Sequence, residues 1–433
     1  MLSVLTQRRA NGGEEMRKAA IVAVLAIVGV TLCPSLIAAG MRSAAPDLSV
    51  KESAVATLPP TADPASIVAS ANLQKIAYVV QRDDGQCVVA DGKAGKTYGR
   101  IYGLAVSPNG KHVAYAAVRD GANLLVYDGA EKREVDGRLE LAFSPDGQRL
   151  AYTVFQPGAG EQPTTAGPQG KARVVVDGSD GREYDWVGQL AFSPDSKRVA
   201  YTAVNDQRGT VVVDGIEGKS FDSSLDQPGG YPAFGPGGKF GYAPQRRKRT
   251  AFRAVLRKAG MADDYRARAI IGAIEGKEYS AVHSITFSPD GTRFGYVGAR
   301  LSGRDRKERA VVDGLENREY EEVRSMVFSP DSKYVAYVAR RGNESVVVVG
   351  GAERYTFENV GDLFFTPDSR HLAFWASSGP DWFVVVDGVQ AGRYDPPPTR
   401  SLTFPQPDSL RALARRGDQL LEVVVDIGRV EGR

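Results

Sequence analysis

A short motif recurs along the chain at nearly constant intervals. "LAFSPDGQRLAY" at Leu141–Tyr152 returns almost unchanged as "LAFSPDSKRVAY" at Leu190–Tyr201. The motif proline stands at Pro108, Pro145, Pro194, Pro236, Pro289, Pro330, Pro367 and Pro407, with spacings of 37, 49, 42, 53, 41, 37 and 40 residues. A ninth, degenerate copy, "IVASANLQKIAY" at Ile67–Tyr78, precedes them. A period near 40 residues indicates one repeat architecture rather than several unrelated domains.

Each repeat predicts four short β-strands. The motif supplies two strands joined by a turn, in which proline fixes φ, aspartate bonds backbone amides and glycine accepts a left-handed conformation. A valine run such as "RVVVDG" (Arg173–Gly178) then predicts a buried third strand that ends in a hairpin. The fourth strand carries an aromatic residue: Tyr98, Tyr184, Phe221, Tyr279, Tyr320 or Tyr394. The predicted fold is all-β: a single β-propeller of four-stranded antiparallel blades, with eight or nine repeat units.

The motif also resembles a known family. "FSPDG-x-R-x-AY" followed by "VVVDG" is similar to the WD-repeat-like propeller units of TolB-like periplasmic proteins of bacteria. The resemblance covers roughly residues 67–431 and implies a repeat propeller. TolB-like proteins also carry a separate N-terminal α/β domain, for which residues 41–66 are too few.

The N-terminal 40 residues have the composition of a targeting segment. "MRKAAIVAVLAIVGVTLCPSLIAAG" (Met16–Gly40) has a basic start, an apolar run and a small-residue end, as a secretory signal peptide does. The alternative is an uncleaved inner-membrane anchor at residues 19–40. Either Met1 or Met16 is the start. We expect residues 1–40 to be an extension and signal peptide or anchor, residues 41–66 a Pro/Ala-rich linker, and residues 67–433 the propeller.

The unequal spacings place extra length in two kinds of connection. Phe155–Ala172 and Gln245–Arg268 fall between the second and third strands of their repeats, and Asp222–Gly230 falls between one repeat and the next. These connections are expected on the same face of the ring, opposite the "SPDG" and "DG" turns. Insertions collected on one face often form the binding face of a repeat protein.

The third insertion is strongly basic. Gln245–Ala269 has nine basic residues against two aspartates. Within it, Phe252, Val255, Leu256 and Ala259 have the i, i+3, i+4, i+7 spacing of a short amphipathic helix, and the alternation of Phe252, Ala254 and Leu256 fits a strand. Two interpretations stay open: a solvated loop, or a docking patch for an acidic partner. The residues predicted to bind are Arg246, Arg247, Lys248, Arg249, Arg253, Arg257 and Lys258.

No catalytic motif appears, and no metal or cofactor site is predicted. Of the three histidines, His112 and His371 occupy equivalent repeat positions, and His283 precedes its motif at the expected channel wall. A net charge of +3 gives no argument for nucleic acid. We therefore expect an exported, monomeric, non-catalytic binding or scaffold propeller of the bacterial cell envelope, engaging a protein or anionic polymer through its loop-rich face. The alternative is a propeller hydrolase or lyase with a site at the central channel.

Overall fold

The chain divides into two compact units, Met1–Arg42 and Ser43–Arg433. The computed structural model describes residues 45–135, 139–157, 170–223, 229–247, 265–302 and 305–428, all within the second unit. These residues form β-strands and two short 3-10 turns, η1 (Pro64–Ser66) and η2 (Pro236–Gly238). No helix among them is long and apolar enough to cross a membrane. The targeting segment predicted at residues 1–40 lies outside the described residues.

The strands form nine blades, numbered here in chain order, in which successive strands pair antiparallel. The first four blades are β2 (Val68–Ala69), β3 (Ile76–Arg82), β4 (Gly85–Ala90), β5 (Lys93–Tyr98); β6 (Arg100–Val106), β7 (Val113–Arg119), β8 (Ala122–Tyr127), β9 (Ala130–Val135); β10 (Leu139–Phe143), β11 (Leu150–Pro157), β12 (Gly170–Val176), β13 (Ser179–Asp180); and β14 (Trp186–Phe192), β15 (Val199–Asn205), β16 (Arg208–Val213), β17 (Ile216–Glu217), with β18 (Phe221–Asp222) also paired to β16.

Blade 5 carries an additional two-stranded sheet. It consists of β19 (Gly230–Phe234), β20 (Phe240–Ala243), β23 (Ile270–Ile271) and β24 (Ile274–Glu275), with β21 (Gln245–Arg247) paired to β22 (Tyr265–Ala267). Blades 6 to 8 are β25 (Ala281–Phe287), β26 (Phe294–Ser302), β27 (Asp305–Val312), β28 (Leu315–Tyr320); β29 (Glu322–Phe328), β30 (Val335–Arg341), β31 (Glu344–Val349), β32 (Ala352–Phe357); and β33 (Asn359–Phe365), β34 (Leu372–Ser378), β35 (Asp381–Val386), β36 (Val389–Tyr394).

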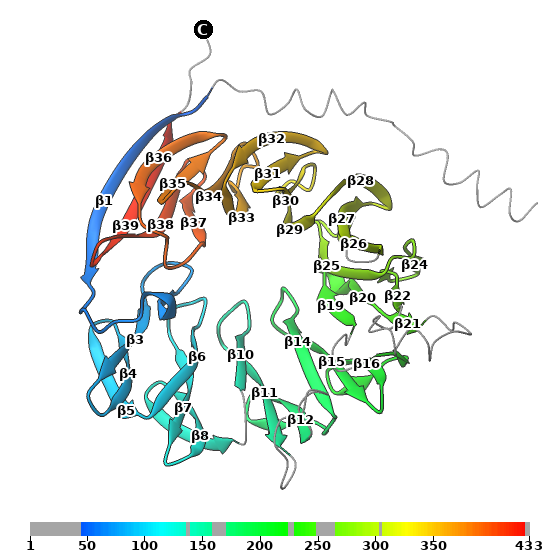
Figure 1. Ribbon diagram of the computed structural model, residues 1–433, viewed down its shortest axis with the longest axis horizontal. Helices are drawn as coiled ribbons and strands as arrows, with labels where there is room; N and C mark the ends of the chain where they lie inside the picture. Colours follow the sequence, from blue (N-terminus) through cyan, green and yellow to red (C-terminus); the bar gives the residue numbers. More distant parts are fainter. Residues whose placement is uncertain are drawn as a thin grey trace, which may run out of the picture. The chain divides into compact units, whose positions relative to one another are not determined.

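Blade 9 joins the two ends of the propeller. It contains β37 (Leu402–Gln406), β38 (Ser409–Arg416), β39 (Gln419–Gly428) and, as its outermost strand, β1 (Asp47–Thr57). The register of β1 on β39 runs from Asp47↔Gly428 to Thr57↔Gln419. Figure 1 shows the blades arranged around a central axis, with first strands such as β6, β10, β14, β29 and β33 nearest the centre. The described residues therefore form a single β-propeller of nine blades, within the predicted eight or nine units.

The prediction of a linker at residues 41–66 is wrong, because β1 and η1 lie there. β1 packs only its inner edge on β39 and leaves most of its side chains exposed. An outer strand of this kind needs little apolar alternation, so its sequence lacks the pattern that marks the other strands. The propeller begins near Asp47 rather than at Ile67.

The repeat motif forms each blade through a fixed set of hydrogen bonds. In blade 3, Ser144 Oγ donates to Asp146 Oδ1 at 2.5 Å and accepts the Arg149 N–H at 2.9 Å, so that the turn closes on itself. Gly147 adopts φ +70° at the position where a side chain would be strained. The Asp146 N–H then donates to Ser196 Oγ of blade 4 at 3.0 Å, which joins adjacent blades at their turns.

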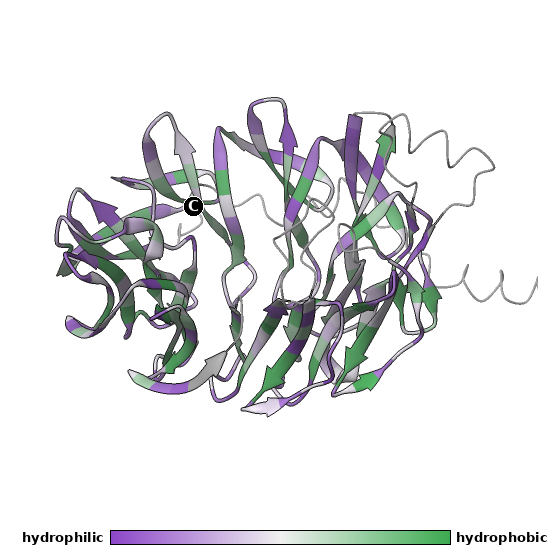
Figure 2. Cartoon of the chain, turned by 60° about the horizontal axis from the view of Figure 1, so that its bottom comes forward, coloured by the Kyte–Doolittle hydropathy of each residue, from purple (hydrophilic) through white to green (hydrophobic). Residues whose placement is uncertain are grey.

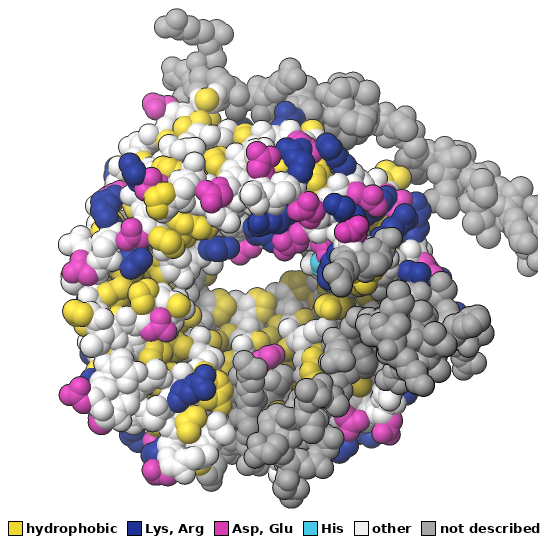
Figure 3. All heavy atoms as spheres, in the orientation of Figure 1, with side chains coloured by type: hydrophobic (Ala, Val, Ile, Leu, Met, Phe, Trp, Pro, Cys, Tyr) yellow, Lys and Arg dark blue, Asp and Glu magenta, His cyan; other side chains and the backbone are white. Residues whose placement is uncertain are grey.

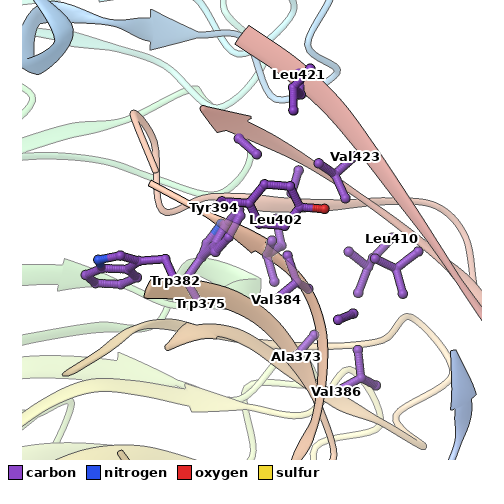
Figure 4. Packing of buried hydrophobic residues seen from close by; sticks show 14 of the residues in the cluster. Ala373, Trp375, Trp382, Val384, Val386, Tyr394, Leu402, Leu410, Leu421 and Val423 are labelled. Carbon is purple, nitrogen blue, oxygen red and sulfur yellow. The ribbon is translucent and has the colours of Figure 1, made fainter. Parts of the chain in front are cut away.

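The core lies between the blades as well as within them. Figure 4 shows one such layer, in which Trp375 and Tyr394 of blade 8 pack against Leu410 and Val423 of blade 9. The two rings meet edge to face with centroids 5.7 Å apart. In Figure 2 the hydrophobic residues concentrate in the strands and the hydrophilic residues in many of the hairpins that join them. A four-stranded sheet cannot bury both faces alone, so each blade depends on its neighbours.

A tyrosine and a glutamate join successive blades at the outer rim. The strand-four tyrosine of one blade donates to the glutamate that begins strand four of the next blade, as Tyr98 does to Glu131 at 3.2 Å. The same bond joins Tyr184 to Glu217, Tyr279 to Glu316 and Tyr320 to Glu353. At the junction of blades 8 and 9, Tyr394 donates to Glu52 of β1 at 2.8 Å. The N-terminal strand thus supplies the contact that the repeat requires there.

Candidate functional site

The three insertions leave the ring on one face, as predicted. Residues 158–169 connect β11 to β12, and residues 248–264 connect β21 to β22. Residues 224–228 lie between β18 and β19, where one blade passes to the next. Because successive strands are antiparallel, these connections share the face opposite the "SPDG" and "DG" turns. We call it the loop-rich face.

The basic insertion begins and ends as the β21–β22 hairpin, which we call the stem. Of the seven residues predicted to bind, Arg246 and Arg247 lie in β21, and Arg246 pairs across the stem with Arg266. Lys248, Arg249, Arg253, Arg257 and Lys258 lie outside the described residues, as does the segment Phe252–Ala259. The structure thus places the start of the predicted patch on the loop-rich face.

The charges of the stem differ in how they are paired. Arg268 contacts Glu275 and Glu278 at 3.1 Å each, and these two carboxylates raise the pKa of its guanidinium. Arg266 donates to Ser280 Oγ at 3.0 Å. Arg246 is exposed and makes no hydrogen bond or ion pair with any described residue. Among the stem side chains that the structure describes, Arg246 is therefore a cation that is left available to a partner.

A second polar cluster surrounds His283 of β25, the first strand of blade 6. Its Nε2 lies 3.2 Å from Glu308 Oε1, and its Nδ1 lies 2.9 Å from Ser284 Oγ. Arg306 donates from Nε to the same Glu308 oxygen at 2.7 Å. Figure 3 shows an opening at the centre of the ring, with Lys, Arg, Asp and Glu side chains together along the rim on the side of β29. The opening is thus bordered by charged side chains on that side.

Glu308 has a structural role that a neutral residue fills elsewhere. Its Oε2 accepts the Val323 N–H of blade 7 at 2.8 Å. In blade 1, Gln86 at the equivalent position accepts the Ile101 N–H at the same distance. Glu308 is only 2% exposed. Burial alone would raise the pKa of this carboxyl, but the bonds from His283 and Val323 and the charge of Arg306 hold it below its usual value.

A bulge in the channel-facing strands sets the direction of these side chains. The pairing of β25 with β26 shifts between His283 and Thr286, and Ser284 adopts φ +54°. The equivalent residues Gly103, Gln189, Tyr231 and Ser325 also have positive φ. The strained conformation of Ser284 is therefore a property of the propeller and is not specific to one site.

Sequence reasoning found His283 but missed Glu308 and Arg306. Glu308 lies in the third strand of its repeat, where the sequence pattern indicates only a buried strand. It comes beside His283 through the register of β26 with β25 and β27. His112 and His371 contact the hairpin residues Asp128 and Asp387 at 2.7 and 2.6 Å, as expected of ordinary strand residues. Within the described ranges, no group of three or more His, Cys, Asp or Glu side chains is arranged to hold a metal ion.

Comparison with known proteins assigns no family. No protein-family model matches the chain, and no curated protein matches it. Solved structures that it resembles include the Dos1 propeller (10% identity, TM-score 0.40, 91% of this chain and 97% of that chain). The propeller domain of the Trilobed protease from Pyrococcus furiosus (11%, 0.38, 86% and 95%) and TolB from Acinetobacter baumannii (14%, 0.29, 82% and 80%) also match. At these values the fold rests on the chain's own sheet topology.

Proposed function

We propose that this propeller is a non-catalytic binding or scaffold protein of the bacterial cell envelope, which engages a protein or anionic polymer through its loop-rich face. The observation that carries the proposal is the position of the basic insertion. It begins at a stem on the loop-rich face, has no counterpart in the other repeats, and presents Arg246 without a partner among the described residues. The export signal predicted at Met16–Gly40 and the TolB-like repeat support an envelope location.

The proposal is tested by neutralising the basic insertion. Replacing Arg246, Arg247, Lys248 and Arg249 with glutamine should weaken capture of a partner from envelope extract, while the melting temperature stays that of the parent. Capture by the parent should fall as salt rises, because exposed charges are screened over about 10 Å at 0.1 M salt and about 3 Å at 1 M. Equal capture by parent and variant at low salt would exclude the insertion from binding.

A second candidate is a hydrolase at the channel. The side chains of Ser284, His283 and Glu308 form a continuous series of contacts from a hydroxyl through an imidazole to a buried carboxylate. An activated serine has this arrangement. A fluorophosphonate probe should then label Ser284, and His283→Gln should abolish the labelling. An unlabelled Ser284 in folded protein leaves the cluster with a structural role in joining blades 6 and 7.

A further inference from the structure

A cavity of about 450 Å³ lies between blades 4 and 5, beside the stem. We call it the stem groove. Blade 4 contributes Arg208, Lys219 and Asp222 to its wall, and blade 5 contributes Tyr242, Gln245, Arg246 and the paired Arg268. The volume is within the range of pockets that hold a small molecule or a few residues of a peptide.

The junction of blades 4 and 5 departs from the contacts that join other blades. At four other junctions, the cation five residues after the first residue of the hairpin turn (Asp91, Asp177, Gly272 or Asp313) contacts the strand-four glutamate of the next blade. The pairs are Lys96 with Glu131 at 3.3 Å, Arg182 with Glu217 at 2.8 Å, Lys277 with Glu316 at 3.1 Å and Arg318 with Glu353 at 2.9 Å. The corresponding pair would be Lys219 with Glu275, but Glu275 is bound by Arg268 from the insertion.

Lys219 is consequently left without a partner among the described residues. It is exposed and lines the stem groove together with Arg246, which also lacks one. The strand-four tyrosine that would bond Glu275 is replaced by Phe221, so the rim contact is missing as well. The basic insertion has thus converted a blade junction into a groove with two cations that no described side chain neutralises.

A buried amide in the groove wall also lacks a partner. Gln245 is 7% exposed, and its Oε1 accepts no hydrogen bond from any residue in the described part of the chain. A buried acceptor without a donor costs roughly 1–3 kcal/mol in proteins generally, and such groups are uncommon without a functional reason. A ligand that carries both anionic groups and N–H donors would complement this wall.

We propose that the stem groove binds a carboxylate-bearing peptide segment of a partner protein, with its carboxylates at Lys219 and Arg246. The inference rests on the proposed binding function and names the chemistry of its partner. Asp222, Glu275 and Glu278 also line the groove. A polyanion carries a negative charge on every monomer unit, so some of its charges would be repelled by these carboxylates. A peptide can place one or two acidic side chains at Lys219 and Arg246 and keep neutral groups elsewhere.

The test measures binding of two fluorescein-labelled eight-residue peptides by anisotropy at low salt. One peptide carries two glutamates three positions apart among Gly, Ser and Leu, and the other carries glutamines instead. The glutamate peptide should bind at least tenfold more tightly. Lys219→Ala and Arg246→Ala should each weaken it about threefold, the scale of exposed charge pairs, and Lys96→Ala, the same change at the equivalent position of blade 1, should leave it unchanged.

Three results would overturn the proposal. They are equal binding of the two peptides, an equal loss in Lys96→Ala, and displacement of the peptide by an oligogalacturonate that binds more tightly, which would assign the groove to acidic sugars.

A variant with glutamine at Arg247, Lys248 and Arg249 separates this proposal from the proposed function, because it alters the insertion and leaves both groove cations in place. One outcome is that partner capture falls in that variant while Lys219→Ala leaves peptide binding intact. In that case the proposal of a peptide site in the stem groove is wrong, and the proposed binding through the loop-rich face is retained.

Discussion

At the scale of single residues, the hairpin aspartates show how much of the fold depends on turn chemistry. Asp177 adopts φ +52°, a region in which aspartate is tolerated better than most residues. Its carboxylate accepts the Leu150 N–H at 3.1 Å and Arg149 Nε at 2.8 Å, and so fixes the start of strand two. The same arrangement recurs at Asp214 and Asp313. These aspartates recur at regular spacing because each one fixes the start of strand two in its own blade.

Replacing Asp177 should therefore affect stability and not binding. Asp177→Ala removes both bonds and places alanine in a left-handed conformation, so the free energy of unfolding should fall by about 1–2 kcal/mol. Asp177→Asn keeps the acceptor and the tolerance of positive φ and should lose less. Thermal unfolding measures both variants, and partner capture is the control. A variant that melts like the parent but no longer binds would give Asp177 a role in the site.

His371 makes the stability of blade 8 depend on pH. The Asp387 carboxylate raises the pKa of the imidazole through a 2.6 Å contact. A group whose pKa is raised in the folded state contributes stability that is complete below its unfolded pKa, about 6.5, and that is lost as pH rises through the folded value.

The urea midpoint should accordingly fall between pH 6 and 8 by more in the parent than in His371→Arg. Arginine stays charged over this range and occupies the equivalent position in blade 3, where Arg149 contacts Asp177. Identical pH profiles for parent and variant would show that this pair contributes nothing to the dependence.

At the scale of elements, the sequence predicts strands well where they are buried and poorly where they lie at an edge. The valine runs of β12, β16 and β31 are apparent because both faces of these strands are covered. β1 has no such pattern, and its partner β39 lies some 370 residues away. The stem groove was equally hidden, because a missing contact such as that between Lys219 and Glu275 is visible only once the blades are in register.

β1 should decide whether the ring closes. A chain that begins at Leu58 lacks β1 and leaves the edge of β39 unpaired, which is a template for association between molecules. It should also lose the contacts of Glu52 with Tyr394 and Arg416. Size-exclusion chromatography with light scattering should show aggregates for this chain and monomers for one that begins at Ala45. A monomer that melts like the parent would mean that β1 is dispensable.

At the scale of the whole molecule, the repeat period was sufficient to predict the architecture. It could not decide between eight and nine blades. The degenerate copy at Ile67–Tyr78 proves to be blade 1, with β3 packed under the residues around Leu58 and Ile67. Blade 9 draws its strands from both ends of the propeller, so no single repeat of the sequence contains it. Counting motifs therefore gives the number of blades only when the pairing of β1 is known.

The last prediction concerns the compartment in which this propeller works. The apolar run after Arg17 and Lys18 has the order of an export signal, so a reporter enzyme that is active only outside the cytoplasm should be active when fused after Arg433. Leu25→Arg with Val28→Arg should abolish that activity, since charges within the run prevent insertion. Both fusions must accumulate to the same level for the comparison to hold. Activity that survives the double change would show that this run is not the export signal. A stable parent fusion without activity would place the propeller in the cytoplasm and remove the envelope from the proposed function.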